Sequence, residues 1–327
     1  MFRVFVVFVL CYDAAVKIAI VGAGGVGGYF GGRLAAAGAE VHFLARGAHL
    51  QALRTAGLRI ESPKGNVHLP RVEATDDPAA IGPSDVVFFT VKLYDSESAI
   101  GALKPLLGPD TVVIPFQNGV ESVGMLTRAI GADHTAGGTA YITAVVAEPG
   151  LIRHTVMDSL FVGETDGRPT ARLERLVGAC RSAGLQATRS DDIGVDIWTK
   201  FVRLSVFSGM TAVTRCPIGP IVSDPALFAM LYGALNEAYA VARASGIAVS
   251  PSIVAEDAVR KAYAAMAPQA KSSMLQDLER GRRLELPWLS GAVVRLGERL
   301  GVPTPTHRFI TAVLMPHVSG SAQGSLA

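Results

Sequence analysis

The chain has 327 residues, half of them hydrophobic and 18% charged, and its formal net charge at pH 7 is +2. This length exceeds one ordinary core, so we expect a globular protein of two domains. No face-wide run of Lys or Arg is present, which excludes the electrostatic footprint of a nucleic-acid-binding protein. The three cysteines, Cys11, Cys180 and Cys216, lack metal-ligand or redox-pair spacing, so we expect no metal site and a reducing compartment.

The first residues form an apolar run from Val4 to Leu10 that follows Arg3. The run resembles a signal-peptide core, but it is far shorter than the roughly 18 residues of a membrane span. We therefore expect no membrane segment. We interpret residues 1–16 as a dispensable extension, with the true start near Val16.

From Lys17 the sequence alternates strand-like and helix-like segments. Continuous apolar runs that end in turn residues are typical of parallel strands buried on both faces. Their alternation with helices predicts an α/β, doubly wound sheet, whose ligand lies beyond the carboxyl ends of the strands. The predicted strands are 17–22, 40–45, 85–91 and 111–115, and the predicted helices are 25–37, 48–56 and 96–107.

After Gly150 the pattern changes, and from Asp191 onward it is mostly helical. We therefore expect an α/β domain over 17–190 and a helical domain over 191–327, with a disordered tail after about residue 317. The Ala-rich segments around 226–265 could form a homodimer face or equally belong to the core. Short strands are predicted at 159–163 and 185–188 around a helix at 170–183, and later helices at 196–213, 226–245, 252–265 and on either side of 281–287.

A glycine-rich segment joins the first strand to the first helix and fits the pattern G-x-G-x-x-G. Gly22 permits a tight turn, Gly24 lets the backbone approach a pyrophosphate, and Gly27 lets helix and strand touch. The free N–H groups at the helix start favour an anion. A Gly-rich packing turn is the alternative, but the position between strand and helix favours a Rossmann dinucleotide site. The site consists of Gly22, Ala23, Gly24, Gly25, Val26 and Gly27.

The end of the second predicted strand indicates which dinucleotide binds. A site for NAD usually places Asp or Glu there, to accept from the ribose hydroxyls. Here the strand ends in Leu44-Ala45-Arg46, without an acid. A guanidinium suits a 2′-phosphate, so we expect NADP, as NADPH, rather than NAD. The alternative is that Arg46 is an ordinary surface residue.

From Lys17 to about Phe309 the chain resembles the ketopantoate reductase (2-dehydropantoate 2-reductase) family. Besides the glycine segment, the family's markers stand here in order, and together they are specific. They are L-A-R at 44–46, T-V-K at 90–92, Q-N-G-V at 117–120, W-T-K at 198–200 and S-S-M-L-Q-D at 272–277, with Glu285 shortly after.

The resemblance implies a role for each of five side chains. Lys200 resembles the family's general acid, and a positioned ammonium can stabilise the developing alkoxide and donate the proton. Glu285 is similar to the glutamate that completes the catalytic site, by orienting Lys200 or the substrate hydroxyl. Ser273 matches the serine that holds the substrate carboxylate. Asn118 matches the asparagine that touches cofactor and substrate, and Lys92 is assigned to the cofactor. Without the resemblance, Lys200 would be a surface lysine, Glu285 a solvated charge, Lys92 a strand cap and Asn118 part of an Asn-Gly turn.

Two positions depart from the family pattern on the helix that carries Lys200. The family has asparagines one and two turns further on, where this chain has Leu204 and Ser208. Residues four apart share a helix face, so both are expected beside Lys200, with Ser208 contacting substrate. A leucine cannot hydrogen-bond a substrate hydroxyl, which puts pantoate itself in doubt. Arg203 is a candidate to compensate.

The resemblance implies NADPH-dependent reduction of 2-dehydropantoate to pantoate, a step of pantothenate biosynthesis, in the cytoplasm, where reduced cofactor is available. One alternative is a related NADP-dependent reductase of another small 2-oxo acid. An alternative of another class is a sensor that binds NADPH without turnover. Retention of Lys200, Ser273 and Glu285 argues against the sensor, because binding alone does not require them.

Overall fold

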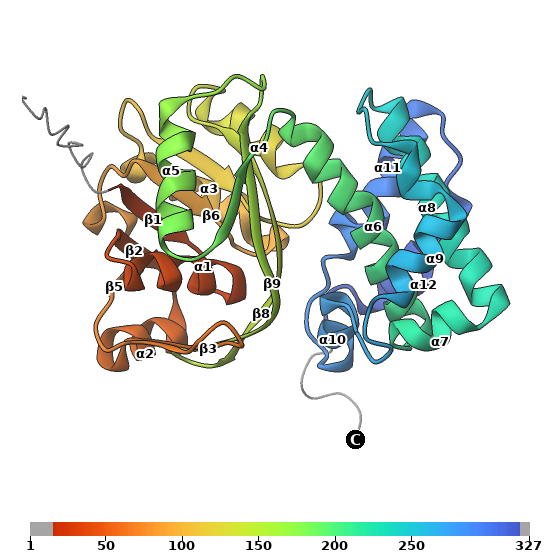
Figure 1. The fold of residues 1–327 in the computed structure, drawn as a ribbon, viewed down its shortest axis with the longest axis horizontal. Helices are drawn as coiled ribbons and strands as arrows, with labels where there is room; N and C mark the ends of the chain where they lie inside the picture. Colours follow the sequence, from red (N-terminus) through yellow and green to blue (C-terminus); the bar gives the residue numbers. More distant parts are fainter. Residues whose placement is uncertain (1–15, 321–327) are drawn as a thin grey trace, which may run out of the picture.

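The structure, a computed structural model, describes residues 16–320. It has an α/β half and a helical half, and the long helix α6 (Ile193–Thr214) runs from one into the other (Figure 1). The extension predicted for residues 1–16 lies outside the described residues, apart from Val16, and Cys11 lies outside them as well.

The α/β half is built on a parallel sheet in the order β5-β2-β1-β6-β7. Every residue of β6 and β7 is buried, as are Ile18 to Val21 of β1, which explains their uninterrupted apolar sequences. The four predicted strands are confirmed, and β5 was not predicted. The strands are β1 (Lys17–Val21), β2 (Glu40–Leu44), β5 (Glu73–Thr75), β6 (Val86–Phe89) and β7 (Val112–Pro115).

Each face of this sheet has its own apolar core. On one face, Tyr29, Phe30 and Leu34 of α1 pack between this sheet and the second sheet. On the other face, Ala99 of α3 and Leu126 of α4 pack against the parallel strands. The helix predicted at 96–107 ends at Gly101, because Pro105 lies in the remainder of the predicted segment. A 3-10 turn forms there instead. The helices of this half are α1 (Gly25–Ala36), α2 (Gly47–Ala56), α3 (Ser96–Gly101), α4 (Ser122–Ile130) and α5 (Ala171–Ser182), and the 3-10 turns are η1 (Pro78–Ala80), η2 (Leu93–Asp95) and η3 (Lys104–Leu106).

A second sheet covers the face that carries α1. Its main feature is a long antiparallel hairpin of β8 and β9, turned at Gly150 with φ +79°. The hairpin lies between α1 and α6 in Figure 1. The sequence predicted only a short strand at 159–163, so most of the hairpin was missed. The strands are β3 (Leu58–Glu61), β4 (Val67–Leu69), β8 (Ala136–Glu148), β9 (Leu151–Glu164) and β10 (Gln186–Arg189).

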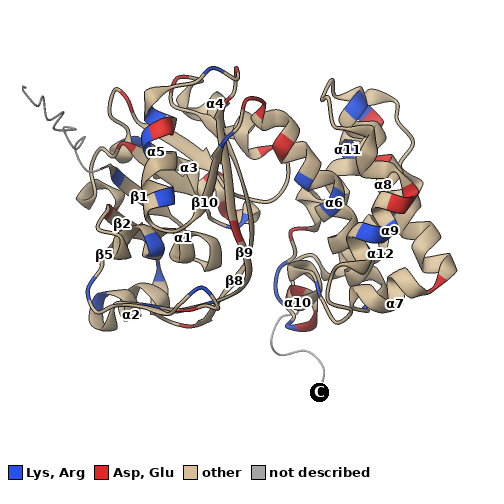
Figure 2. Cartoon of the chain, viewed as in Figure 1, with Lys and Arg blue, Asp and Glu red and all other residues tan. Residues whose placement is uncertain are grey.

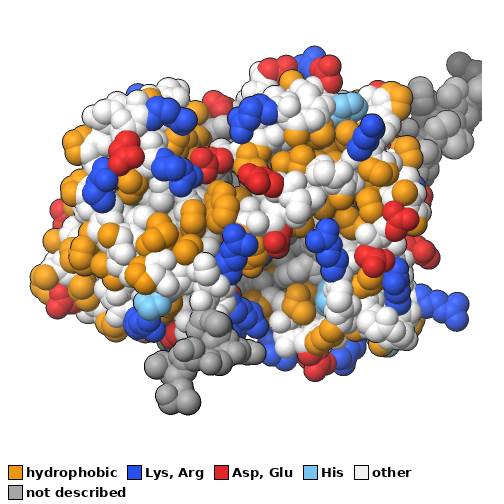
Figure 3. Space-filling view, turned by 180° about the vertical axis from the view of Figure 1, so that it is seen from behind, with side chains coloured by type: hydrophobic (Ala, Val, Ile, Leu, Met, Phe, Trp, Pro, Cys, Tyr) orange, Lys and Arg blue, Asp and Glu red, His pale blue; other side chains and the backbone are white. Residues whose placement is uncertain are grey.

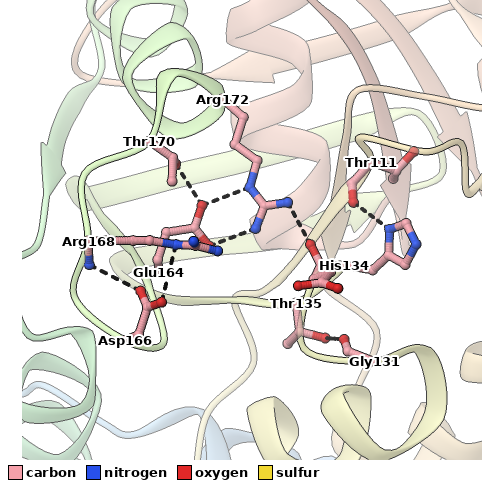
Figure 4. A network of polar contacts seen from close by, with 10 residues as sticks. Thr111, Gly131, His134, Thr135, Glu164, Asp166, Arg168, Thr170 and Arg172 are labelled. Atoms are coloured by element: carbon pink, nitrogen blue, oxygen red, sulfur yellow. Dashed lines mark hydrogen bonds and ion pairs between the residues drawn. The ribbon is translucent and has the colours of Figure 1, made fainter.

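A buried ion pair fixes the end of this hairpin to the start of α5 (Figure 4). The guanidinium of Arg172 donates to both carboxylate oxygens of Glu164, each at 2.7 Å, and to the carbonyl of Asp133 at 2.6 Å. Thr170 donates to the same carboxylate at 2.6 Å. Burial raises the pKa of Glu164, but the hydrogen bonds from Arg172 and Thr170 outweigh it, so the net pKa is lowered.

The helical half has a separate core formed mainly by α6, α8, α11 and α12. Ala234, Ala238 and Ala242 of α8 are fully buried in it, so these small residues pack helices together and do not form an exposed face. The helices are α7 (Ile218–Ser223), α8 (Pro225–Ala244), α9 (Glu256–Ala264), α10 (Ser273–Glu279), α11 (Ser290–Leu300) and α12 (Pro305–Leu314), and the 3-10 turns are η4 (Pro251–Val254), η5 (Leu286–Trp288) and η6 (Met315–His317).

The end of the described chain lies against this half. Leu284 donates its N–H to the carbonyl of Val318 at 2.9 Å, and Gly320 lies next to Gly281. Residues 318–320 are therefore placed, and the rest of the predicted tail lies outside the described residues.

Charges are interspersed over both halves (Figure 2). Residues 16–320 include no helix that is both long enough and apolar enough to cross a membrane.

Candidate active site

The glycine segment forms a tight turn between β1 and α1. Gly22 has φ +101°, and a Cβ there would lie 2.7 Å from the backbone nitrogen of Val91. A Cβ on Gly27 would lie 2.3 Å from the carbonyl oxygen of Gly22 and 2.4 Å from Oγ1 of Thr90. Gly24 differs, because a Cβ there would meet nothing within 4 Å. Gly22 and Gly27 are thus required by packing, whereas open space lies beside Gly24.

The start of α1 is suited to an anion. Gly24 is the N-cap and offers no side-chain cap, and the first turn contains no acidic residue. The N–H groups at the start of a helix carry a partial positive charge. Ala23 is buried and Val26 packs against the core. A Cβ on Gly25 would lie 2.1 Å from the carbonyl oxygen of Ala144 in β8, so the unpredicted hairpin requires a glycine at this position.

Arg46 lies at the same edge of the sheet. Gly22 donates its N–H to the carbonyl of Leu44 at 3.1 Å, which brings the end of β2 beside the glycine turn. Arg46 is the N-cap of α2 and is exposed. No ion pair within residues 16–320 involves it, so its guanidinium is available to a ligand.

Lys200 reaches from the helical half to two elements of the α/β half. Its ammonium donates to Oδ1 of Asn118, beyond β7, at 3.1 Å, and to the carbonyl of Ala140 in β8 at 2.7 Å. Burial lowers the pKa of Lys200 to about 8, although the negative charge of Glu285 opposes that shift. The result is an ammonium held by two acceptors that can lose its proton near neutral pH.

Lys92 and Glu285 form a second bridge between the halves. The ammonium of Lys92 lies 3.2 Å from Glu285 and 3.4 Å from Asp277. Glu285, only 6% exposed, also accepts the N–H of Leu93 at 3.2 Å. Partial burial lowers the pKa of Lys92, but the two carboxylates outweigh it and the net pKa is raised. Glu285 therefore orients Lys92 directly and acts on Lys200 through its charge. Of the two roles expected from the sequence, orienting Lys200 is not achieved by a hydrogen bond, and orienting the substrate hydroxyl stays a prediction.

Within residues 16–320, neither Ser208 nor Ser273 forms a hydrogen bond with Lys200. Ser208 is fully buried with its hydroxyl unpartnered. Ser273 is the exposed first residue of α10. The preceding Ser272 is the N-cap of this helix, and its hydroxyl accepts a hydrogen bond from the hydroxyl of Thr211. Leu204 is half-buried and packs against the helical core.

Arg203, the residue expected to compensate for Leu204, is exposed. Its backbone carbonyl accepts a hydrogen bond from Tyr263 at 3.4 Å. Its side chain forms no hydrogen bond or ion pair with another described residue.

Two polar groups of this site were missed by the sequence analysis. The carbonyl of Ala140 gave no signal, because β8 was not predicted. Asp277 is the last residue of the S-S-M-L-Q-D marker, which could have pointed to it. Figure 3 shows the molecule hollowed between its two halves, with Lys and Arg side chains around the hollow.

The site combines two features: a glycine turn with open space beside it on a doubly wound sheet, and a lysine supplied by the helical half. This combination is that of an oxidoreductase that uses a nicotinamide dinucleotide. Two family models, ketopantoate reductase PanE/ApbA and its C-terminal counterpart, match residues 18–167 and 192–317. The chain belongs to the ketopantoate reductase family.

Individual relatives agree with this assignment. A 2-dehydropantoate 2-reductase of Mesorhizobium japonicum is 34% identical, over 91% of this chain and 95% of the relative. The crystal structure of a PanE/ApbA family ketopantoate reductase from Ralstonia eutropha has a TM-score of 0.84 at 34% identity, covering 92% of this chain and 98% of that one. D-mandelate dehydrogenase, in a ternary structure with NADH and anilino(oxo)acetate, also has a TM-score of 0.84, over 92% of this chain and 97% of that one. At 22% identity this last similarity shows the fold alone.

Proposed function

We propose that the protein uses NADPH to reduce the ketone of a small 2-oxo acid to a 2-hydroxy acid, with 2-dehydropantoate as the leading substrate and pantoate as its product. The observation that carries the proposal is the position of Lys200. Its ammonium is held between Asn118 and Ala140, at the carboxyl edge of the parallel sheet, which is where ligands bind in doubly wound folds.

The residues at the glycine turn fit a dinucleotide. The open space beside Gly24 and the uncapped start of α1 suit a pyrophosphate. Gly22, Ala23, Gly25, Val26 and Gly27 shape this turn. When bound, the nicotinamide supplies a hydride to the carbonyl carbon of the substrate.

Lys200 supplies the proton in this proposal. As hydride reaches the carbonyl carbon, negative charge develops on oxygen, and the ammonium stabilises that charge and donates its proton. A pKa of about 8 keeps Lys200 mostly protonated at pH 7 while making proton release easy. Asn118 and Ala140 position the ammonium, because each accepts one of its three N–H bonds.

Lys92 and Glu285 set the distance between the two halves. Their ion pair joins the end of β6 to the turn η5, and the N–H of Leu93 adds a second bond to the same carboxylate. We assign Lys92 to the cofactor side of the cleft and Glu285 to the substrate side. In this role Glu285 holds Lys92 in place and maintains the charge of Lys200.

Arg46 supports the choice of NADPH over NADH. It stands at the end of β2 without a carboxylate partner among the described residues, and the residues directly after that strand include no acid. A guanidinium at this position favours a 2′-phosphate, whereas an acid would favour a ribose hydroxyl.

Two residues of α6 favour a second candidate substrate, a 2-oxo acid that lacks the terminal hydroxyl of 2-dehydropantoate. Leu204 offers no hydrogen bond, and the hydroxyl of Ser208 has no exposed surface. Ser273, exposed at the start of α10, remains the proposed partner of the substrate carboxylate.

The test is steady-state oxidation of NADPH with 2-dehydropantoate and with simpler branched 2-oxo acids. Turnover with none of these acids would contradict the proposal. Since the reaction consumes reduced cofactor, we place it in the cytoplasm.

A further inference from the structure

A cavity of about 640 Å³ lies where the two halves meet, and it contains none of the side chains proposed for catalysis. One wall comes from the segment after β6 and from α4, and the other from the turn η5 and its neighbours in the helical half. Pockets that bind small molecules measure roughly 300–1,000 Å³. The cavity is therefore large enough for a compact ligand.

Three arginines and two glutamates provide the charged groups of this cavity. Arg295 is neutralised, since it pairs with Glu121 at 2.8 Å and donates to the carbonyl of Pro287 at 2.6 Å. Arg128 and Arg283 have no carboxylate partner within residues 16–320, and the second glutamate, Glu97, forms no ion pair there either. Two guanidinium groups, one from each half, are thus free to bind an anion, and their geometry suits phosphate oxygens.

The rest of the lining is largely apolar and includes two aromatic rings. Leu93, Ile100 and Met125 lie on the α/β side, with Tyr94, and Trp288 lies opposite on the helical side. The guanidinium of Arg283 already lies 4.5 Å from the ring centre of Tyr94. Aromatic surfaces beside arginines favour a flat ring that carries negative charge.

We infer that this cavity is a second ligand site, which binds a small aromatic phosphate monoester between Arg128 and Arg283. The phosphate of such an ester carries nearly two negative charges at pH 7. The two unpaired guanidinium groups attract it and outnumber the one unpaired carboxylate, that of Glu97. The ring lies against Trp288 and the apolar wall. This binding does not depend on the reduction proposed above.

The cavity shares its wall with the catalytic contacts. The N–H of Leu93 is bound by Glu285, and Trp288 belongs to the turn that Glu285 begins. The carbonyl oxygen of Trp288 lies 3.0 Å from where a Cβ on Gly119 would be, one residue after Asn118. A ligand that bridges the two walls therefore supports the same closed arrangement that aligns Lys92 with Glu285.

The position of Trp288 provides a direct assay, because the chain has only two tryptophans. The Trp198→Phe variant leaves Trp288 as the sole reporter. We expect phenyl phosphate to change its emission saturably, and the change to persist when saturating NADP⁺ occupies the dinucleotide site. Inorganic phosphate should bind at least tenfold more weakly, since it lacks the ring. Titration calorimetry on the unmodified protein checks the same affinities without the substitution.

The matched variants are Arg128→Gln combined with Arg283→Gln, and Arg175→Gln on the exposed face of α5 as the charge control. The first should raise the Kd for phenyl phosphate at least tenfold, and the control should leave it within twofold. Unchanged thermal unfolding and NADPH affinity would show that the variants are folded. Displacement of phenyl phosphate by NADP⁺, equal binding by the double variant, or no saturable signal in either assay would overturn the inference.

Discussion

The ionisation of Lys200 leads to a quantitative prediction for the pH dependence of the reaction. Burial sets its pKa at about 8 in the protein without ligands, and kcat/KM reports ionisations of the free enzyme. Because the protonated form is the acid, kcat/KM should be level below about pH 7 and fall about tenfold for each pH unit above about 8. The measurement is kcat/KM for NADPH-dependent reduction from pH 6 to pH 10 at constant ionic strength.

Replacing Glu285 with Gln tests the electrostatic part of this reasoning. The negative charge of Glu285 raises the pKa of Lys200, so its removal should move the descending limb to lower pH. The control is Lys200→Arg, whose guanidinium stays protonated throughout and should abolish the limb in whatever activity remains. A descending limb that stays at the same pH in Glu285→Gln, a limb that persists in Lys200→Arg, or a flat profile of the unmodified protein up to pH 10 would refute the assignment of this ionisation to Lys200.

Three further predictions concern cofactor, substrate and stability. NADPH should bind at least tenfold tighter than NADH, a difference of about 1.4 kcal/mol in binding free energy. Arg46→Ala should reduce that ratio of affinities and leave the affinity for NADH nearly unchanged. Equal loss of affinity for both cofactors would mean that Arg46 supports the fold. The kcat/KM values for 2-dehydropantoate and for its analogue without the terminal hydroxyl should lie within roughly a factor of ten of each other. Leu204→Asn should raise the selectivity for 2-dehydropantoate. A preference of the unmodified enzyme for 2-dehydropantoate by several orders of magnitude would contradict this expectation. Arg172→Ala should lower the free energy of unfolding at pH 7 by about 3 kcal/mol, since it leaves Glu164 buried without its partner, whereas Arg175→Ala on the same helix should have little effect. Because the folded-state pKa of Glu164 is lowered, its stabilisation is present above the unfolded-state pKa and lost as pH falls through the folded-state pKa, so the Arg172→Ala deficit measured by urea unfolding should shrink in acid.

The helices and strands that the sequence predicted are those determined by residues adjacent to one another in the chain. β1, the glycine turn and α1 are encoded in consecutive positions, where an apolar run meets glycines. The hairpin of β8 and β9 depends on pairing between distant residues, so no local pattern marked its full length. The contacts of the site were missed for the same reason, since Lys92 and Glu285 are 193 residues apart in the chain.

Ser208 shows a different limit of sequence reasoning. Leu204 and Ser208 both lie in α6, and their spacing of four residues puts them along one side of the helix. It could not show that packing against α6 leaves Ser208 with no exposed surface. For this reason Leu204→Asn is the cleaner test of substrate choice, because a larger side chain at Ser208 would have to displace core atoms.

The most direct test of the central claim compares single-turnover reduction by the unmodified protein and by Lys200→Ala. Both proteins are preloaded with NADPH and mixed with 2-dehydropantoate, and loss of the reduced cofactor is followed by absorbance. We expect turnover by the unmodified protein, a rate at least roughly a hundredfold lower for Lys200→Ala, and NADPH affinity close to that of the unmodified protein for the variant. A rate for Lys200→Ala near that of the unmodified protein would contradict the account.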